Sequence, residues 1–160
     1  MVSSDDLQIL LNYAYFYLKF RPRTKKEVHD YLLKKIKKRH WSTDDVDEAI
    51  KQLEERSLIN DKEFVRWFVE QRARGKPKGR FVLKAELLRL GIAKELIDQH
   101  LEENPLKEED LAFAALKSKW QRFKNLTPKA RFEKSAAFLL RRGFSFEIIK
   151  QTIYRLEEQR

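Results

Sequence analysis

A three-helix pattern that recurs along the chain constrains its fold more than any other feature. The pattern is complete in residues 60–101, where three amphipathic segments are separated by residues that end helices. Asn60 is followed three residues later by Glu63, the spacing of a helix N-cap and the side chain that reaches back to it. Pro77 interrupts the pattern after the first segment, and Gly91 follows the second, where glycine is the favoured residue. This stretch therefore predicts three short helices.

A similar unit precedes this one. Residues 5–20 place apolar side chains on one helical stripe, which predicts a first helix over that range. Thr24 with Glu27, and Ser42 with Asp45, have the spacing of capping pairs and predict the starts of two more helices.

A third unit follows the central one. Residues 106–125 have the apolar spacing of one long helix. Thr127 followed by Pro128 is a cap and then the residue best tolerated at the first helical position, and Ser145 caps the last predicted helix.

The repeat is visible in the residues themselves. The segment PKGRF at 77–81 aligns with PKARF at 128–132, and after one inserted residue Gly91 aligns with Gly143. Tandem helical repeats bury their faces against their neighbours and expose a continuous surface. The sequence therefore predicts an all-α fold, an elongated and curved tandem array of three three-helix repeats, with boundaries at 1–59, 60–104 and 105–160.

Composition limits the classes of protein that this chain can belong to. A hydrophobic content of 42% with 12% aromatic residues suffices for a core, and four glycines and four prolines in 160 residues favour helix. No stretch approaches about 18 consecutive apolar residues, and the N-terminus lacks the pattern of a secretory signal, so we expect a cytoplasmic protein without a membrane segment. The absence of cysteine excludes disulfides and thiolate zinc sites.

The positive charge is concentrated in two places. A net charge of +10 predicts an anionic partner, whether nucleic acid or an acidic protein surface. We predict a binding surface from the first basic cluster, which comprises Arg72, Arg74, Lys76, Lys78, Arg80 and Lys84. Lys129 and Arg131 occupy the aligned position in the third repeat and are predicted to join it. Arg21 and Arg23 are weaker candidates, since they can instead cap the carbonyls that end the first helix. The alternative for every such cluster is a solvated helix face.

Other kinds of site have little support. The three tryptophans could stack on nucleic-acid bases. Trp67 and Trp120 are in phase with core residues and are interpreted as packing, whereas Trp41 is left open. No metal is expected, because His29, His40 and His100 share no ligand spacing, and there is no glycine-rich phosphate loop. We therefore expect a protein that is not an enzyme and needs no cofactor.

Several of these motifs together resemble the RecX family of recombination regulators. The resemblance is carried by RPRT at 21–24, by LIND at 58–61 with Phe64 and Trp67, and by Gly91-Ile92, in that order and spacing. It covers almost the whole chain and is strongest from residue 58 to residue 92.

The resemblance implies a cytoplasmic protein that binds the RecA recombinase in the helical groove of its filament on DNA and lowers its ATPase and strand-exchange activities. It also implies weak, non-specific contact with single- and double-stranded DNA, and we expect a monomer. The alternative is a stand-alone DNA- or RNA-binding helical module that does not read sequence. A helical adaptor for an unrelated acidic protein is the third interpretation.

Overall fold

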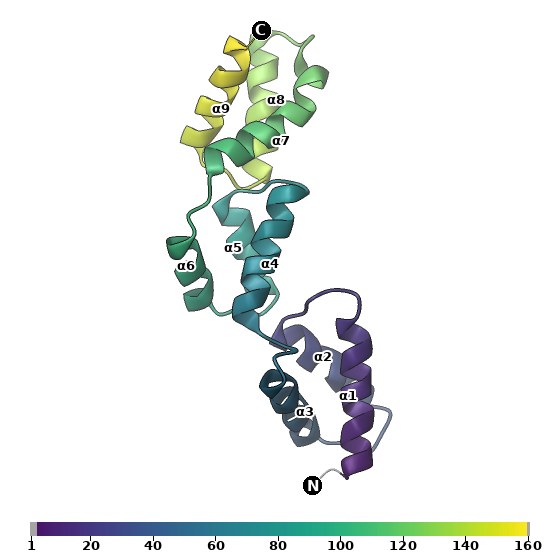
Figure 1. The fold of residues 1–160 in the computed structure, drawn as a ribbon. Coiled ribbons are helices and arrows are strands. Elements are labelled where there is room, and N and C mark those ends of the chain that lie inside the picture. The colour runs from purple at the N-terminus through teal and green to yellow at the C-terminus, as the bar shows by residue number, and fades with distance from the viewer. Residues whose placement is uncertain (1–2, 160) are drawn as a thin grey trace. The chain divides into compact units, whose positions relative to one another are not determined.

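The structure, a computed structural model, describes residues 3–159, and all of the regular structure in that range is helical (Figure 1). The described residues form nine α-helices. They are α1 (Ser4–Leu18), α2 (Lys25–Ile36), α3 (Thr43–Glu55), α4 (Asp61–Arg74), α5 (Arg80–Arg89), α6 (Lys94–Glu103), α7 (Glu108–Phe123), α8 (Pro128–Arg141) and α9 (Phe146–Glu158). The prediction of an all-α fold of nine helices is therefore confirmed within this range.

The predicted caps begin the helices as expected. The Thr24 and Ser42 hydroxyls each accept a hydrogen bond from the backbone N–H three residues on, and the Glu27 and Asp45 carboxylates each accept one from the backbone N–H of the cap residue. Thr127 and Ser145 cap α8 and α9 in the simpler one-way form, and Pro128 is the first residue of α8.

Two helices are shorter than the apolar pattern predicts. The segment 5–20 forms a helix from Ser4 that ends at Leu18, shortly before Arg21, where Pro22 disfavours helical backbone. The segment 106–125 is helical only from Glu108 to Phe123, with three acidic residues in its first turn, where the helix dipole favours negative charge.

The described chain divides into two compact units. The first contains the residues up to Trp67 together with Leu88–Ile97, and the second contains Phe68–Leu87 together with the residues from Asp98 onward. In the first unit α1, α2 and α3 pack against one another. Their apolar core consists of Leu10, Leu11, Ala14, Val28, Leu32, Ile36, Val46, Ala49, Ile50, Leu53 and Ile59.

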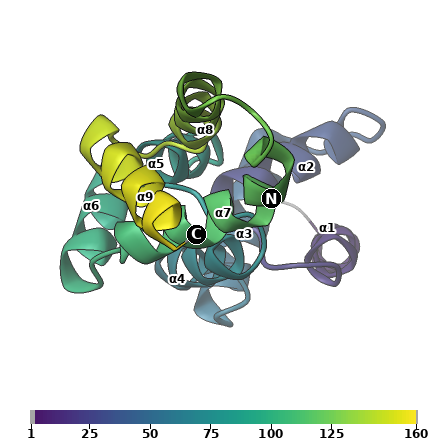
Figure 2. The same cartoon turned by 90° about the horizontal axis from the view of Figure 1, so that it is seen from above.

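In the second unit α7, α8 and α9 pack against one another (Figure 1 and Figure 2). Their core consists of Ala112, Ala115, Leu116, Phe138, Leu139, Phe144, Ile149, Ile153 and Leu156. Each of these two three-helix groups thus has its own apolar centre, as the amphipathic stripes predict. Among residues 3–159, no helix has the length and apolar character needed to cross a membrane.

Within the first unit, the start of α2 contacts the residues that follow α5. The Thr24 hydroxyl donates a hydrogen bond of 2.6 Å to the Leu90 carbonyl. Gly91, at φ +90°, packs so closely on the Lys26 side chain that an added Cβ would lie 2.4 Å from it. The Lys25 backbone N–H donates to Asp61 Oδ1 at 2.9 Å. Burial raises the pKa of Asp61, and this bond from Lys25 acts against that rise.

The second unit repeats this arrangement with different residues. The Gly79 backbone N–H donates to the Arg142 carbonyl at 2.7 Å, and Gly143, at φ +91°, lies against Val82. The Arg80 backbone N–H donates to Glu108 Oε1 at 2.9 Å. In both units the first N–H of a middle helix is therefore bound by an acidic first residue of a later helix, and a left-handed glycine supports the contact.

Candidate functional site: a basic link between two helices

The segment between α4 and α5 is held in place by its backbone. Besides the bond from Gly79 to Arg142, the Arg142 guanidinium donates to the Pro77 carbonyl at 3.2 Å. A Cβ added at Gly79 would lie 2.3 Å from the Gly143 carbonyl oxygen, so only glycine permits this approach. Because these contacts fix the link on the end of α8, the side chains that it carries are presented from a fixed base.

Two of the predicted binding cations already have an acidic partner. Glu86 on α5 accepts a hydrogen bond from the Arg72 Nε at 2.9 Å and another from the Lys78 Nζ. Arg72 also lies 4.7 Å from the centre of the Phe68 ring. Burial of Glu86 favours its neutral form, but the bonds from Lys78 and Arg72 outweigh this and hold the pKa of Glu86 below its usual value. Arg72 and Lys78 therefore tie α4 and the link to α5.

Lys84 is also engaged within the second unit. Its ammonium lies 2.9 Å from Asp98 Oδ1, and both side chains are partly exposed. This pair joins α5 to α6.

Three predicted cations remain exposed in the link. Arg74, Lys76 and Arg80 are exposed, and in the described part of the chain no side-chain ion pair is formed by any of them. Phe81, the next residue, is 70% exposed, which is unusual for a large apolar ring. These four residues lie within eight positions of one another on the pinned segment, and we call them the link patch. Phe81 was not among the sequence-predicted site residues, because its place in the apolar pattern indicated core.

Arg21 and Arg23 have structural partners in the first unit. Arg21 forms an ion pair with Glu27 at the start of α2. Arg23 donates to the Tyr17 carbonyl at 3.3 Å and lies 4.0 Å from the centre of the Tyr17 ring, so its side chain contacts the last turn of α1. Arg23 also borders a pocket of about 370 Å³ with Leu58 and Trp67.

Lys129 and Arg131 lie in different environments. Lys129 is exposed, whereas Arg131 is 3% exposed and donates to Glu157 on α9 and to the Lys124 and Leu126 carbonyls. The alignment of PKARF with PKGRF pairs Arg131 with the exposed Arg80, but the two backbones differ. Because α8 begins at Pro128 and α5 begins only at Arg80, Arg131 lies one turn inside its helix. Its guanidinium is therefore engaged inside the second unit, unlike that of Arg80.

The three tryptophans each pack against apolar side chains. Trp41 and Trp120 are partly buried against the two apolar cores, and Trp67 lies 5.5 Å from Phe64, ring centre to ring centre. Within residues 3–159, no group of three or more His, Asp or Glu side chains is arranged to hold a metal ion.

Three models of one family match the chain in succession. The first three-helix domain of RecX matches residues 11–53, the second matches residues 60–101 and the third matches residues 107–153. Regulatory protein RecX of Bacillus cytotoxicus is 30% identical over 158 residues, which cover 98% of this chain and 57% of that protein. Regulatory protein RecX of Streptococcus agalactiae is 30% identical over 147 residues, covering 91% of this chain and 55% of that protein. The chain thus spans about half the length of the curated relatives it matches.

Solved structures show the same fold. A crystal structure of RecX from Lactobacillus salivarius superposes with a TM-score of 0.79 at 26% identity, covering 97% of this chain and 99% of that one. A second crystal structure, of a regulatory protein RecX, has a TM-score of 0.73 at 23% identity and supports the fold alone.

Proposed function

The chain belongs to the RecX family, and we propose that it regulates the RecA recombinase by binding the RecA filament on DNA. In this proposal it lies in the helical groove of the filament and lowers the ATPase and strand-exchange activities that serve recombination and DNA repair. The relatives are named regulatory proteins, which supports a regulator as the general role.

The observation that carries the proposal is the link patch. Arg74, Lys76 and Arg80 present three cations that form no ion pair with residues 3–159, on a segment whose backbone is fixed by Gly79 and Arg142. Such cations are suited to DNA phosphates or to acidic surfaces of filament subunits. Because the segment is ordered before binding, less conformational entropy is lost when a partner docks. Exposed Phe81 supplies an aromatic anchor beside the charges.

The first test is the steady-state ATPase of the recombinase on single-stranded DNA, titrated with this protein. If the protein acts on a filament, the ATPase rate should already fall at ratios well below one protein per recombinase subunit. The reason is that one bound molecule blocks or shortens a run of subunits. No effect at any ratio, with direct DNA binding intact, would contradict the proposal and favour the stand-alone nucleic-acid module.

The second test separates the link patch from the rest of the protein. The triple variant R74E/K76E/R80E should lose filament binding and ATPase inhibition while it keeps its helicity and melting temperature, because none of the three side chains forms an ion pair within the described part of the chain. Arg72 and Lys78 stay unchanged, since their reversal would break the bonds to Glu86. The matched control is K37E/K51E/K62E, which reverses three exposed lysines in the first unit and should retain inhibition. Equal inhibition by both variants would place the contact elsewhere.

We also propose that the protein works in the cytoplasm as a monomer, without catalysis of its own. Sedimentation equilibrium would contradict the monomer if the mass exceeded that of one 19.3 kDa chain at micromolar concentration.

A further inference from the structure

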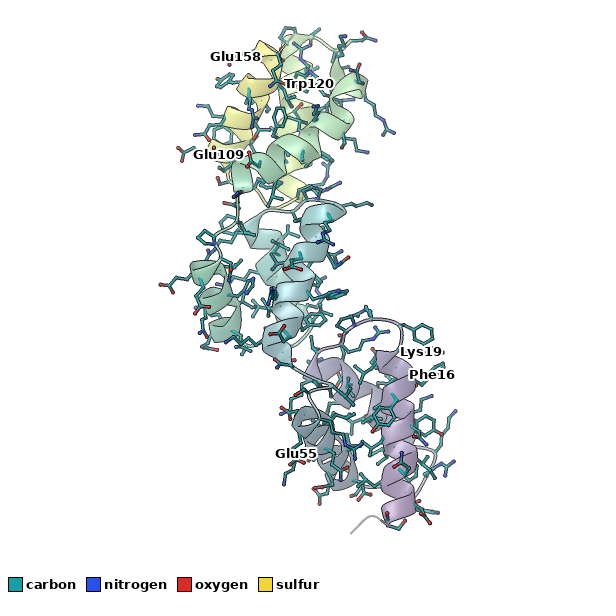
Figure 3. The ribbon with its side chains drawn as sticks, viewed as in Figure 1. Phe16, Lys19, Glu55, Glu109, Trp120 and Glu158 are labelled. Atoms are coloured by element: carbon teal, nitrogen blue, oxygen red, sulfur yellow. The ribbon has the colours of Figure 1, made fainter. Side chains whose placement is uncertain are left out.

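A small pocket in the second unit combines an aromatic ring with two cations. It lies between α7 and the end of α9, has a volume of about 250 Å³, and is lined by Lys117, Trp120, Gln121, Lys124, Leu156 and Gln159. Figure 3 labels Trp120 on α7, near the end of α9 that carries Glu158.

Helical spacing places the functional side chains on one face of α7. Lys117 lies three residues before Trp120 and Lys124 four residues after it, so a cation is one turn away in each direction. The two lysines are about 10 Å apart along the helix axis. Both are exposed, and no ion pair from either side chain is present in the described residues. The pocket is therefore lined by a lysine on each side of Trp120, and the Lys117 ammonium lies 5.7 Å from the centre of the Phe113 ring one turn earlier.

The Trp120 ring is held from the interior. It packs against the α7, α8 and α9 core, and the buried guanidinium of Arg131 lies 5.7 Å from the ring centre. Glu157 follows the pocket residue Leu156 in the sequence, and its carboxylate accepts hydrogen bonds from Arg131. Since the ring is fixed on its buried side but remains partly exposed, it offers a stationary apolar surface to the pocket.

We propose that this pocket binds one base of a single-stranded nucleic acid. The base stacks on the accessible part of Trp120, and Lys117 and Lys124 neutralise the phosphates on its two sides. Gln121 and Gln159 line the pocket with amides that can both donate and accept hydrogen bonds, so they tolerate any base edge. The proposal thus assigns sequence-indifferent contact with a single strand to one defined pocket in the second unit, separate from the link patch.

The features of the pocket favour a single strand over other anionic partners. In a duplex both faces of each base are covered by stacked neighbours, so a ring in a pocket of this size can reach only an unstacked base. An acidic peptide would use the lysines without requiring the ring between them. Docking of such a peptide is therefore an outcome that the test must distinguish.

The test measures binding of the full chain to a fluorescent dT oligonucleotide, by anisotropy and without recombinase. K117E/K124E should weaken binding at least tenfold, and W120L about tenfold, in line with the loss of one stacked base. The control K51E/K62E, which reverses two exposed lysines outside the pocket, should change binding less than twofold. W120L should bind a duplex of equal length within twofold of the unchanged protein, because no base is stacked there.

A second measurement does not depend on the stability of W120L. The variant W41F/W67F keeps Trp120 as its one tryptophan, and its emission should be quenched by the dT oligonucleotide with the midpoint that anisotropy gives. Unchanged emission during binding would overturn the proposal, as would equal losses of single-strand and duplex binding in W120L. Normal oligonucleotide binding by K117E/K124E together with lost binding to the recombinase alone would also overturn it and assign the pocket to a protein partner. Because recombinase is absent from the oligonucleotide assays, their failure leaves the proposed regulation untouched.

Discussion

Glu86 is the residue that holds two of the basic side chains in ion pairs within the second unit. It is partly buried, with 17% of its side chain exposed, and it binds Arg72 and Lys78 from two directions. A carboxylate in this position must be charged to satisfy both donors, which is why its pKa lies below the usual value although burial acts the other way.

The first prediction concerns E86Q, which keeps the size of the side chain but removes its charge. At pH 7 we expect a loss of about 1–2 kcal/mol in the free energy of unfolding, because hydrogen bonds to a charged group are weakened. The pKa of Glu86 is lowered in the folded state, so its contribution is complete above the unfolded value and is lost as pH falls through the folded value. The difference between E86Q and the unchanged protein should therefore shrink below about pH 4.

Urea denaturation at several pH values checks this prediction. E133Q is the matched control, since Glu133 is exposed on α8, and it should change the free energy of unfolding by less than about 0.5 kcal/mol. A difference between E86Q and the unchanged protein that is as large at pH 3 as at pH 7 would show that charge is not its source.

Arg131 gives the second prediction at this scale. Its side chain is 4% exposed, and its loss removes the guanidinium that donates to Glu157 and to two backbone carbonyls. We expect R131A to lose about 3 kcal/mol of stability, as for other broken buried pairs. K129A, two residues earlier on the exposed face, should stay within about 0.5 kcal/mol. Thermal melting distinguishes them, and a fully stable R131A with weakened partner binding would restore Arg131 to the binding surface.

At the scale of the elements, Gly79 decides how the link meets α8. G79A would place a methyl group 2.3 Å from the backbone oxygen of Gly143, which cannot rotate away. It would also weaken the Gly79 to Arg142 bond, so we expect a loss of about 1–3 kcal/mol and a melting temperature lower by several degrees. G75A is the control in the same link, because its nearest neighbour, the Gln71 carbonyl oxygen, would lie 3.4 Å away. Equal melting temperatures for the two variants would mean that the link is not held by this contact.

The helices were largely predictable because their signals are local. A helix start is marked by each of the capping pairs Thr24 with Glu27 and Ser42 with Asp45, and a helix end by the glycines at 91 and 143. Each of these signals can be recognised from a few neighbouring residues. The alignment of the repeats was less informative, because a shared motif does not fix where each helix begins. Arg80 and Arg131 share the motif, yet one begins α5 and the other lies inside α8.

The site was only partly predictable, because charge clusters do not reveal their internal partners. Arg72, Lys78 and Lys84 look alike in the sequence to Arg74, Lys76 and Arg80. The difference depends on Glu86 and Asp98, whose distances to the lysines and arginine are set by the packing of three helices. The three repeat boundaries at 59, 104 and 160 stay a prediction.

At the scale of the whole molecule, the net charge of +10 predicts weak binding to naked DNA that falls steeply with salt. For single strands, the logarithm of the binding constant falls with the logarithm of salt concentration by about 0.7 for each phosphate neutralised. If the three link-patch cations each neutralise one phosphate, R74Q/K76Q/R80Q should reduce the steepness of this slope by about 2. The control K37Q/K51Q/K62Q removes the same charge from exposed positions in the first unit and should alter the slope by less than about half as much. Titrations of a dT oligonucleotide at four or more salt concentrations measure both slopes. Equal changes in the two variants would mean that DNA responds to the total charge of the molecule, and the link patch would then have to act on the protein part of the filament.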